Sequence, residues 1–254
     1  MLHSFDDAGV RIVDHHTATE QFAQFERNEA AANRQVTGDR SWLLPPMSAA
    51  TTHVFDHSYE TTVETPTVTA FEDGDTFSFD GTELEVVHTS GHADGLCIFE
   101  CGQDVLSGDA LLPVYTPNVG GADVRVDRPL EKYLRALRNV VDADYARAWP
   151  GHREPIEDPA GRAAYIIRHH EERAWRVLDA LRRLGPCTTW EVSAELFGEL
   201  NGIHILHGPG ESHAHLEHLE RSGTVEVDGG VYRLADGTEG KLAALDETRW
   251  DLTY

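Results

Sequence analysis

Three short segments carry side chains that can bind a metal ion, and each follows a stretch predicted to be a β-strand. They are His88-Thr89-Ser90-Gly91-His92, Ser107-Gly108-Asp109 and Pro150-Gly151-His152. Glycine lets the backbone turn sharply after a strand, so the next side chain can point into a cleft. Two imidazoles and a carboxylate suit zinc, or iron or manganese in a mixed nitrogen and oxygen site. Each segment alone is a weak signal, but the three together predict a metal site.

In these segments and their order, the sequence resembles the metallo-β-lactamase superfamily over roughly Val10 to Pro155. The resemblance implies that His92 binds the first of two metal ions, that Asp109 bridges both, and that His152 binds the second. It implies Zn²⁺, with iron or manganese as alternatives, and a water activated by the metal that attacks a carbonyl or phosphoryl centre. His88 is not a ligand by this resemblance and is interpreted as a strand residue.

The first motif of that family, His-x-His-x-Asp-His, does not occur in the sequence. Two Asp-His pairs, Asp14-His15 and Asp56-His57, lack the two preceding histidines. Leu2 to Val13 resembles the helix and strand that follow the motif in the family, so we expect the chain to begin just after it. A start codon placed too far downstream, or a truncated chain, explains this most simply, and a naturally degenerate protein is the alternative. With so few ligands we expect weakened metal binding.

The elements that must position the three segments form an α+β pattern. Asp80-Gly81 indicates a hairpin between strands at Thr76–Phe79 and Glu83–His88. Together with the resemblance, this pattern predicts the αββα sandwich of the metallo-β-lactamase fold, N-terminally incomplete, over residues 1–158. The other expected strands and helices are Leu2–Ala8, Val10–Val13, Thr17–Val36, Thr67–Phe71, Cys97–Cys101, Val105–Leu106, Leu130–Val141 and Arg147–Trp149.

The composition shifts near Asp158 towards helical spacing of apolar residues. Three helices are expected at Arg162–Leu184, Thr188–Phe197 and Glu211–Ser222, followed by a hairpin at Thr224–Val227 and Val231–Leu234. This order resembles a winged helix, which we expect at residues 159–237, with an acidic, poorly ordered tail at 238–254. Nucleic-acid recognition would need a basic third helix, and this one is acidic, so a packing or substrate-shaping role is favoured.

Two further groups of residues are candidate sites. Tyr115 to Asp123 is a polar, glycine-containing loop after Asp109, and we predict that Tyr115 and Asn118 bind substrate; a plain surface loop is an equal alternative. Five histidines gather between Asn201 and Arg221, and a surface face is favoured over a metal site because the sequence fixes no carboxylate or cysteine partner. They are His204, His207, His213, His215 and His218.

Composition limits the function classes. The 254 residues carry a net charge of −23 spread along the chain, and Lys132 and Lys241 are the only lysines, a pattern that resembles haloarchaeal proteins. This charge disfavours a simple electrostatic grip on nucleic acid. Three cysteines predict a reducing cytoplasm, and neither a signal peptide nor a membrane span is expected. The oligomeric state is left open.

The sequence therefore predicts a metal-dependent hydrolase that acts on a small-molecule ester, thioester or phosphodiester. One alternative is a nucleic-acid-processing or nucleic-acid-binding protein that acts through the winged helix. Another is a catalytically impaired fragment.

Overall fold

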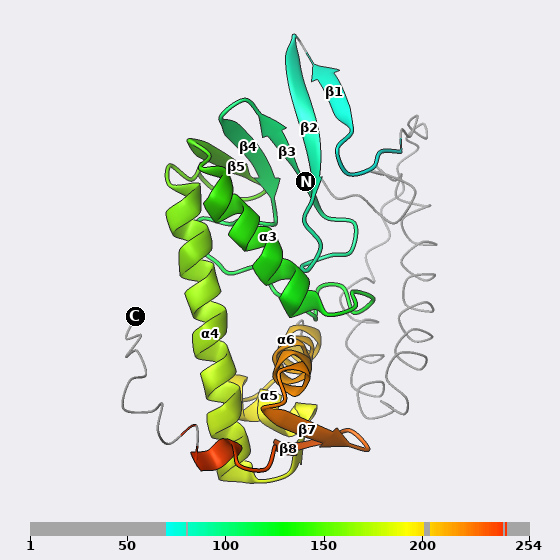
Figure 1. The fold of residues 1–254 in the computed structure, drawn as a ribbon, viewed down its shortest axis with the longest axis vertical. Coiled ribbons are helices and arrows are strands. Elements are labelled where there is room, and N and C mark those ends of the chain that lie inside the picture. The colour runs from blue at the N-terminus through cyan, green and yellow to red at the C-terminus, as the bar shows by residue number, and fades with distance from the viewer. Residues whose placement is uncertain (1–69, 80, 201–203, 241, 243–254) are drawn as a thin grey trace.

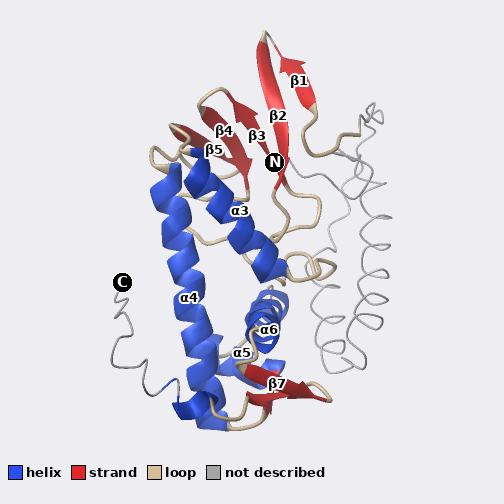
Figure 2. Ribbon diagram, in the orientation of Figure 1, coloured by secondary structure: helices blue, strands red, loops and turns tan. Residues whose placement is uncertain are grey.

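The computed structural model describes residues 70–79, 81–200, 204–240 and 242, and these form a mixed α+β structure (Figure 1). A five-stranded sheet lies at one end, covered on one face by two helices, and a smaller helical unit with three short strands lies at the other (Figure 2). The elements are β1 Thr76–Phe79, β2 Thr82–His88, β3 Cys97–Cys101, β4 Asp104–Gly108, α3 Pro129–Ala143, β5 Arg147–Pro150, α4 Pro159–Leu184, β6 Cys187–Thr188, α5 Thr189–Phe197, α6 His204–Arg221, β7 Val225–Asp228 and β8 Val231–Leu234.

The large sheet has the order β1-β2-β3-β4-β5. Its first four strands pair antiparallel, whereas β4 and β5 pair parallel and are joined through α3. Parallel neighbours need such a crossover because a tight turn can only reverse the chain. Since β2 and β4 are both antiparallel to β3, the strands β2, β4 and β5 all run in one direction. Their carboxyl ends therefore meet at one edge of the sheet.

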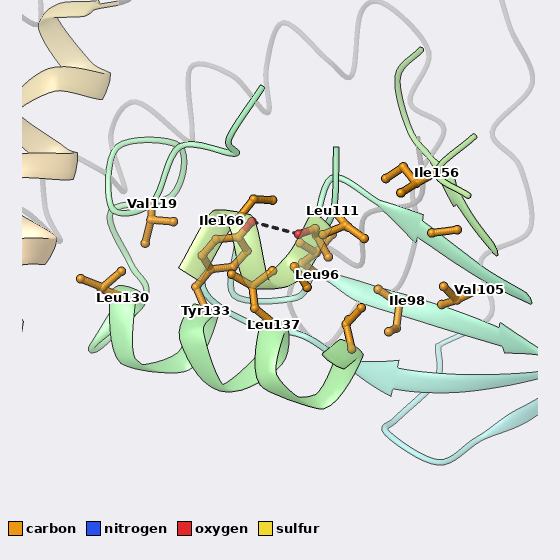
Figure 3. Close-up of a cluster of buried hydrophobic side chains, with 14 of the residues drawn as sticks. Leu96, Ile98, Val105, Leu111, Val119, Leu130, Tyr133, Leu137, Ile156 and Ile166 are labelled. Atoms are coloured by element: carbon orange, nitrogen blue, oxygen red, sulfur yellow. Dashed lines mark hydrogen bonds between the residues drawn. The ribbon is translucent and has the colours of Figure 1, made fainter. Parts of the chain in front are cut away.

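Helix α3 packs its apolar stripe against one face of this sheet (Figure 3). Tyr133 is its largest fully buried side chain, and the phenol donates a 3.0 Å hydrogen bond to the carbonyl of Ala110. Ala110 lies just after β4, so this bond fastens the helix to the end of that strand. A buried hydroxyl needs such a partner, because an unmade hydrogen bond there would cost about 1–3 kcal/mol.

Helix α4 contributes to two separate cores. Ala163 and Ile166, near its start, pack with the sheet and α3, whereas Val177 and Leu181, near its end, pack with α5, α6 and the small sheet. Asp158 caps the helix by accepting a 2.8 Å hydrogen bond from the backbone N–H of Gly161. The predicted domain boundary after Asp158 thus falls before a helix whose first turns belong to the core of the first unit.

The C-terminal unit has three helices followed by the β7–β8 hairpin, as predicted, and β6 adds to β8 to give the order β6-β8-β7. The capping box predicted at the start of α5 is present. Thr188 accepts from the backbone N–H of Glu191, and the Glu191 carboxylate accepts from that of Thr188. None of the described helices is both long enough and apolar enough to cross a bilayer.

Three predictions about elements need correction, and others lie outside the described residues. Ala70 and Phe71 are not in a strand, although Thr67–Phe71 was predicted as one. Helix α6 begins seven residues before the predicted Glu211, with Pro209 inside it. Of the tail predicted to be poorly ordered at 238–254, residues 238–240 and 242 are helical and Leu242 packs in the second core, whereas residues 243–254 lie outside the described residues. The elements predicted at Leu2–Ala8, Val10–Val13 and Thr17–Val36 lie outside the described residues.

The loop after β2 lies against α3 at Gly91, and a substitution at this glycine tests the contact. Gly91 has φ +143°, and a Cβ there would lie 2.5 Å from the Cβ of Tyr133. We expect Gly91→Ala to lower the free energy of unfolding by about 1–3 kcal/mol more than Gly102→Ala, because overpacking adds to backbone strain. Gly102 is a matched control, with φ +64° and nothing within 4 Å of its would-be Cβ. Urea denaturation measures both; equal losses would contradict the packing argument.

Candidate metal centre

Asp109 and His152 meet at the edge where the parallel strands end. Gly108 at the end of β4 pairs with Pro150 at the end of β5, and the N–H of Gly151 donates a 2.8 Å hydrogen bond to the carbonyl of Gly108. This register places Asp109 Oδ1 3.4 Å from His152 Nε2. The Asp109 side chain is 10% exposed and that of His152 is 53% exposed, so the pair opens to solvent on the histidine side.

Gly151 is required by the closeness of this pair. A Cβ at this position would lie 2.8 Å from Asp109 Oδ1 and 3.3 Å from the carbonyl carbon of Gly108. Any side chain would therefore displace the Asp109 carboxylate from this position. Gly151, the glycine of the third predicted segment, therefore has two roles. It lets the backbone turn, and it leaves room for the Asp109 carboxylate.

His92 lies in the loop that follows β2, at the same edge of the sheet. Its Nδ1 is 2.7 Å from the backbone carbonyl of Asn118. Since a carbonyl only accepts, Nδ1 carries the proton of the neutral ring and Nε2 carries the lone pair. His88, which the sequence did not favour as a ligand, instead has its Nε2 2.5 Å from the backbone carbonyl of Asp94 within the same loop.

Two observations fit the binding of a metal ion by these three side chains. The 3.4 Å between Asp109 Oδ1 and His152 Nε2 is close to the ~3.3–3.5 Å that separates two ligands of one tetrahedral ion at about 2.0–2.2 Å. The bond from His92 Nδ1 to a backbone carbonyl is the arrangement by which proteins orient a metal-binding imidazole. The donor set of two imidazoles and one carboxylate suits zinc, and also iron or manganese.

The ligand atoms of His92, Asp109 and His152 do not all lie within 4.8 Å of one another. A dinuclear centre tolerates this spread, because its ions lie about 3.5–4 Å apart and His92 and His152 would bind different ions. Among the described residues, the group of three that does meet this distance is His170, Glu211 and His215. The sequence pattern favoured a surface face for His215, but this side chain is fully buried.

Asn118, predicted to bind substrate, has its side-chain amide engaged within the protein. Its Nδ2 donates to the carbonyl of His207 and to Glu211 Oε2, each at 3.1 Å, and its Oδ1 accepts from the N–H of Gly121. A substrate contact through this amide would have to replace one of these bonds. Asn118 links the His92 ring, through its backbone, to helix α6, through its side chain.

Tyr115, the other predicted substrate residue, is exposed beside the segment that carries His152. The guanidinium of Arg153 lies 4.8 Å from the centre of the Tyr115 ring and donates a 2.7 Å hydrogen bond to its hydroxyl. Arg153 has φ 69°, an uncommon conformation for a residue with a side chain. Arg162 of α4 donates to the carbonyl of Tyr115 and so holds the backbone of the loop.

The described structure resembles that of a metallo-β-lactamase family protein from Thermus thermophilus. The two share 30% sequence identity with a TM-score of 0.60, over 80% of this chain and 67% of the other. The chain belongs to the metallo-β-lactamase family. A fly protein from Drosophila melanogaster described as "Beta-lactamase-like protein 2 homolog" is 31% identical over 103 residues, which are 40% of this chain and 32% of the fly protein. Family membership supports a metal-dependent hydrolase at the level of the family.

Residues 1–75 match a different family, described as "Nitric oxide synthase, oxygenase domain". A nitric oxide synthase oxygenase from Staphylococcus aureus is 56% identical over 66 residues, which are 26% of this chain. The chain spans only 18% of the length of that curated relative. Leu2 to Val13, interpreted above as the opening helix and strand of the metallo-β-lactamase fold, falls within this segment and outside the described residues.

This second similarity was not predicted from the sequence, although one signal pointed to it. The alternating β pattern begins only after Pro66, and the segment before it is predicted to be mostly helix and loop, with one short strand at Val10–Val13. That change in pattern lies close to the end of the matched range at residue 75. Such a change in pattern is more typical of a junction between two kinds of sequence than of the interior of one domain.

The contact at Gly151 provides a test of the metal centre. We expect Gly151→Ala to weaken metal binding about tenfold or more, because the new methyl group would displace the Asp109 carboxylate, and shifts in groups that orient ligands typically cost 10–100-fold. Isothermal titration with Zn²⁺ measures this, with Gly102→Ala as the control at an open position. Unchanged affinity in Gly151→Ala would show that the carboxylate takes no part in binding.

Proposed function

We propose that this chain is a metal-dependent hydrolase in which His92, Asp109 and His152 contribute to a dinuclear, zinc-type centre. The observation that carries the proposal is the 3.4 Å approach of Asp109 Oδ1 and His152 Nε2 at the shared end of two parallel strands. The substrate is an ester, a thioester or a phosphodiester. When bound, the metal would supply a nucleophilic water near neutral pH and stabilise the negative oxygen that develops.

The chain's own residues prepare this chemistry by orientation. Asn118 fixes the ring of His92 with the lone pair on Nε2, and Gly108 and Gly151 hold Asp109 beside His152. The 10% exposure of the Asp109 side chain shields it from bulk water, which strengthens its interaction with any cation. His152 forms the open side, where substrate would enter.

Arg153 and Tyr115 would face the substrate at this open side. The ring of Tyr115 and the hydrogen bond to its hydroxyl hold the guanidinium of Arg153 in place, next in sequence to His152. A fixed guanidinium binds carboxylate and phosphate groups through paired hydrogen bonds. This favours a substrate with an anionic group close to the bond that is cleaved.

The C-terminal unit, which we propose to be a winged helix, has a packing role in this account. Helix α6 holds the loop at residues 118–121 through Asn118 and through a close approach of Gly210 to Gly120 and Gly121. The acidic charge of the chain, −23, disfavours the alternative of nucleic-acid binding through this unit. Nitric oxide synthase activity is not proposed, because the matching segment spans 18% of the curated relative.

The missing His-x-His-x-Asp-His motif limits how tightly the chain would hold its metals. Four ligands of the family's two ions come from that motif by the resemblance, and the sequence lacks it. Fewer ligands give less negative charge and a less fixed geometry, so affinity falls. We therefore expect activity to depend on added metal in the assay, and a catalytically impaired fragment is the alternative.

Asp109 gives the sharpest test of the function. With added Zn²⁺ or Mn²⁺, we expect hydrolysis of a chromogenic ester, thioester or phosphodiester by the unsubstituted protein. Asp109→Ala should reduce the rate about 10²-fold or more, because it removes a ligand rather than a supporting contact. Asp127→Ala is the matched control, since its carboxylate is exposed and pairs only locally with Arg128. Absence of metal-dependent turnover by the unsubstituted protein, or equal rates in the two variants, would contradict the proposal.

A further inference from the structure

A second group of metal-ligating side chains lies buried between helices α4 and α6, away from the sheet edge. His170 of α4 is 2% exposed and His215 of α6 is 0% exposed. The side chain of Glu211, one turn before His215, is 13% exposed. Ligand atoms of the three all lie within 4.8 Å of one another. Figure 1 shows α6 beside α4, below the end of α3.

The ring of His215 is oriented as a metal ligand would be. Its Nδ1 is 2.8 Å from the backbone carbonyl of Glu211, so Nδ1 carries the proton and Nε2 carries a lone pair. Burial, the largest cause, lowers the pKa of His215 to about 3, so the ring is neutral at pH 7. Neutral imidazoles with one nitrogen bonded to a carbonyl are the form in which histidine binds metals.

The lone pair of His215 faces His170. His215 Nε2 lies 3.3 Å from His170 Nδ1, and His170 Nε2 is buried without a hydrogen-bond partner. If Nδ1 of His170 donates to Nε2 of His215, then Nε2 of His170 is a buried acceptor without a partner. If Nε2 of His170 carries the proton instead, it is a buried donor without a partner. The lone pairs of His170 Nδ1 and His215 Nε2 then face each other. Either tautomer therefore leaves the buried Nε2 of His170 without a hydrogen-bond partner.

A cation between the two rings would bind both of the lone pairs that face each other in the second arrangement, whereas the Nε2–H of His170 would keep no hydrogen-bond partner. Two nitrogens at about 2.0–2.1 Å from a tetrahedral zinc ion lie roughly 3.3–3.4 Å apart, which matches the 3.3 Å between these rings. Tyr133 packs edge-on against the His170 ring at 5.6 Å between centroids and holds its plane. The separation and the fixed rings therefore suit a zinc ion with little rearrangement.

Glu211 supplies the third ligand. Its Oε1 accepts a 2.8 Å bond from Arg173, and its Oε2 accepts a 3.1 Å bond from Asn118. Each carboxylate oxygen has further lone pairs, so it can bind a cation and keep these partners. Burial, the largest cause, raises the pKa of Glu211, whereas Arg173 opposes this, so a second cation would further stabilise the charged form. The charge of Arg173 also repels a metal ion and limits its affinity.

We propose that His170, Glu211 and His215 form a structural binding site for Zn²⁺ that joins α4 to α6, separate from the candidate centre at the sheet edge. Two imidazoles and one glutamate are a donor set that zinc binds in proteins. The ion would connect α6 to α4, the helix that contributes to both cores. Through Asn118 it would also steady the loop that orients His92.

The test is metal binding in a protein whose candidate centre has been disabled. Chelator-stripped Asp109→Ala protein is titrated with Zn²⁺ in a calorimeter, and bound zinc is counted by elemental analysis after gel filtration. We expect one ion to be retained, and Zn²⁺ to raise the thermal unfolding temperature. Adding His215→Gln should abolish both effects. Adding His218→Gln, on the same helix but outside the three ligands, should leave both unchanged.

A spectroscopic readout covers the case in which His215→Gln fails to fold. Co²⁺ bound to Asp109→Ala protein should show the intense visible absorption of a tetrahedral site, and His170→Gln should remove it. Equal zinc binding in the presence and absence of His215→Gln would overturn the proposal. So would a folded Asp109→Ala protein that binds no zinc, because the cluster would then be a polar network alone. These readouts do not depend on turnover. The proposal of this zinc site can therefore fail while the proposed hydrolase function holds, and the reverse.

Discussion

The parallel pairing of β4 with β5 is the constraint on which the candidate centre depends. Gly108 is in register with Pro150, and the N–H of Gly151 donates a hydrogen bond to the carbonyl of Gly108. Asp109 and His152, which follow these residues, therefore lie next to each other. Antiparallel pairing would have sent the two segments to opposite edges of the sheet. The crossover helix α3 makes the parallel pairing feasible, and Tyr133 fastens that helix to the residue after Asp109.

Polar contacts connect the sheet edge to helices α4 and α6. Asn118 holds His92 on one side and Glu211 on the other, and Glu211 is paired with Arg173 of α4. Such buried networks are costly when one member is lost, because the remaining groups are left unsatisfied. Helices α4 and α6 thus contribute to the geometry of a site whose ligands all come from the first unit.

Local signals in the sequence were sufficient for much of the fold. The strands on either side of Asp80-Gly81 and the capping box of Thr188 and Glu191 were predicted because neighbouring residues determine them. The early start of α6 was missed, because Pro209 between Gly208 and Gly210 reads as a break, whereas packing of Gly210 against Gly121 overrides that preference. The His170 and His215 pair was missed because 45 residues separate its members, and only the packing of α4 on α6 brings them together. Asp109 and His152 were found because each follows a strand.

The most direct test of the account is the anomalous scattering of a crystal soaked in Zn²⁺. We predict zinc at the sheet edge, with His92 Nε2, Asp109 and His152 Nε2 each about 2.0–2.2 Å from an ion. A structure in which these three side chains point in unrelated directions, with no zinc between them, would contradict it.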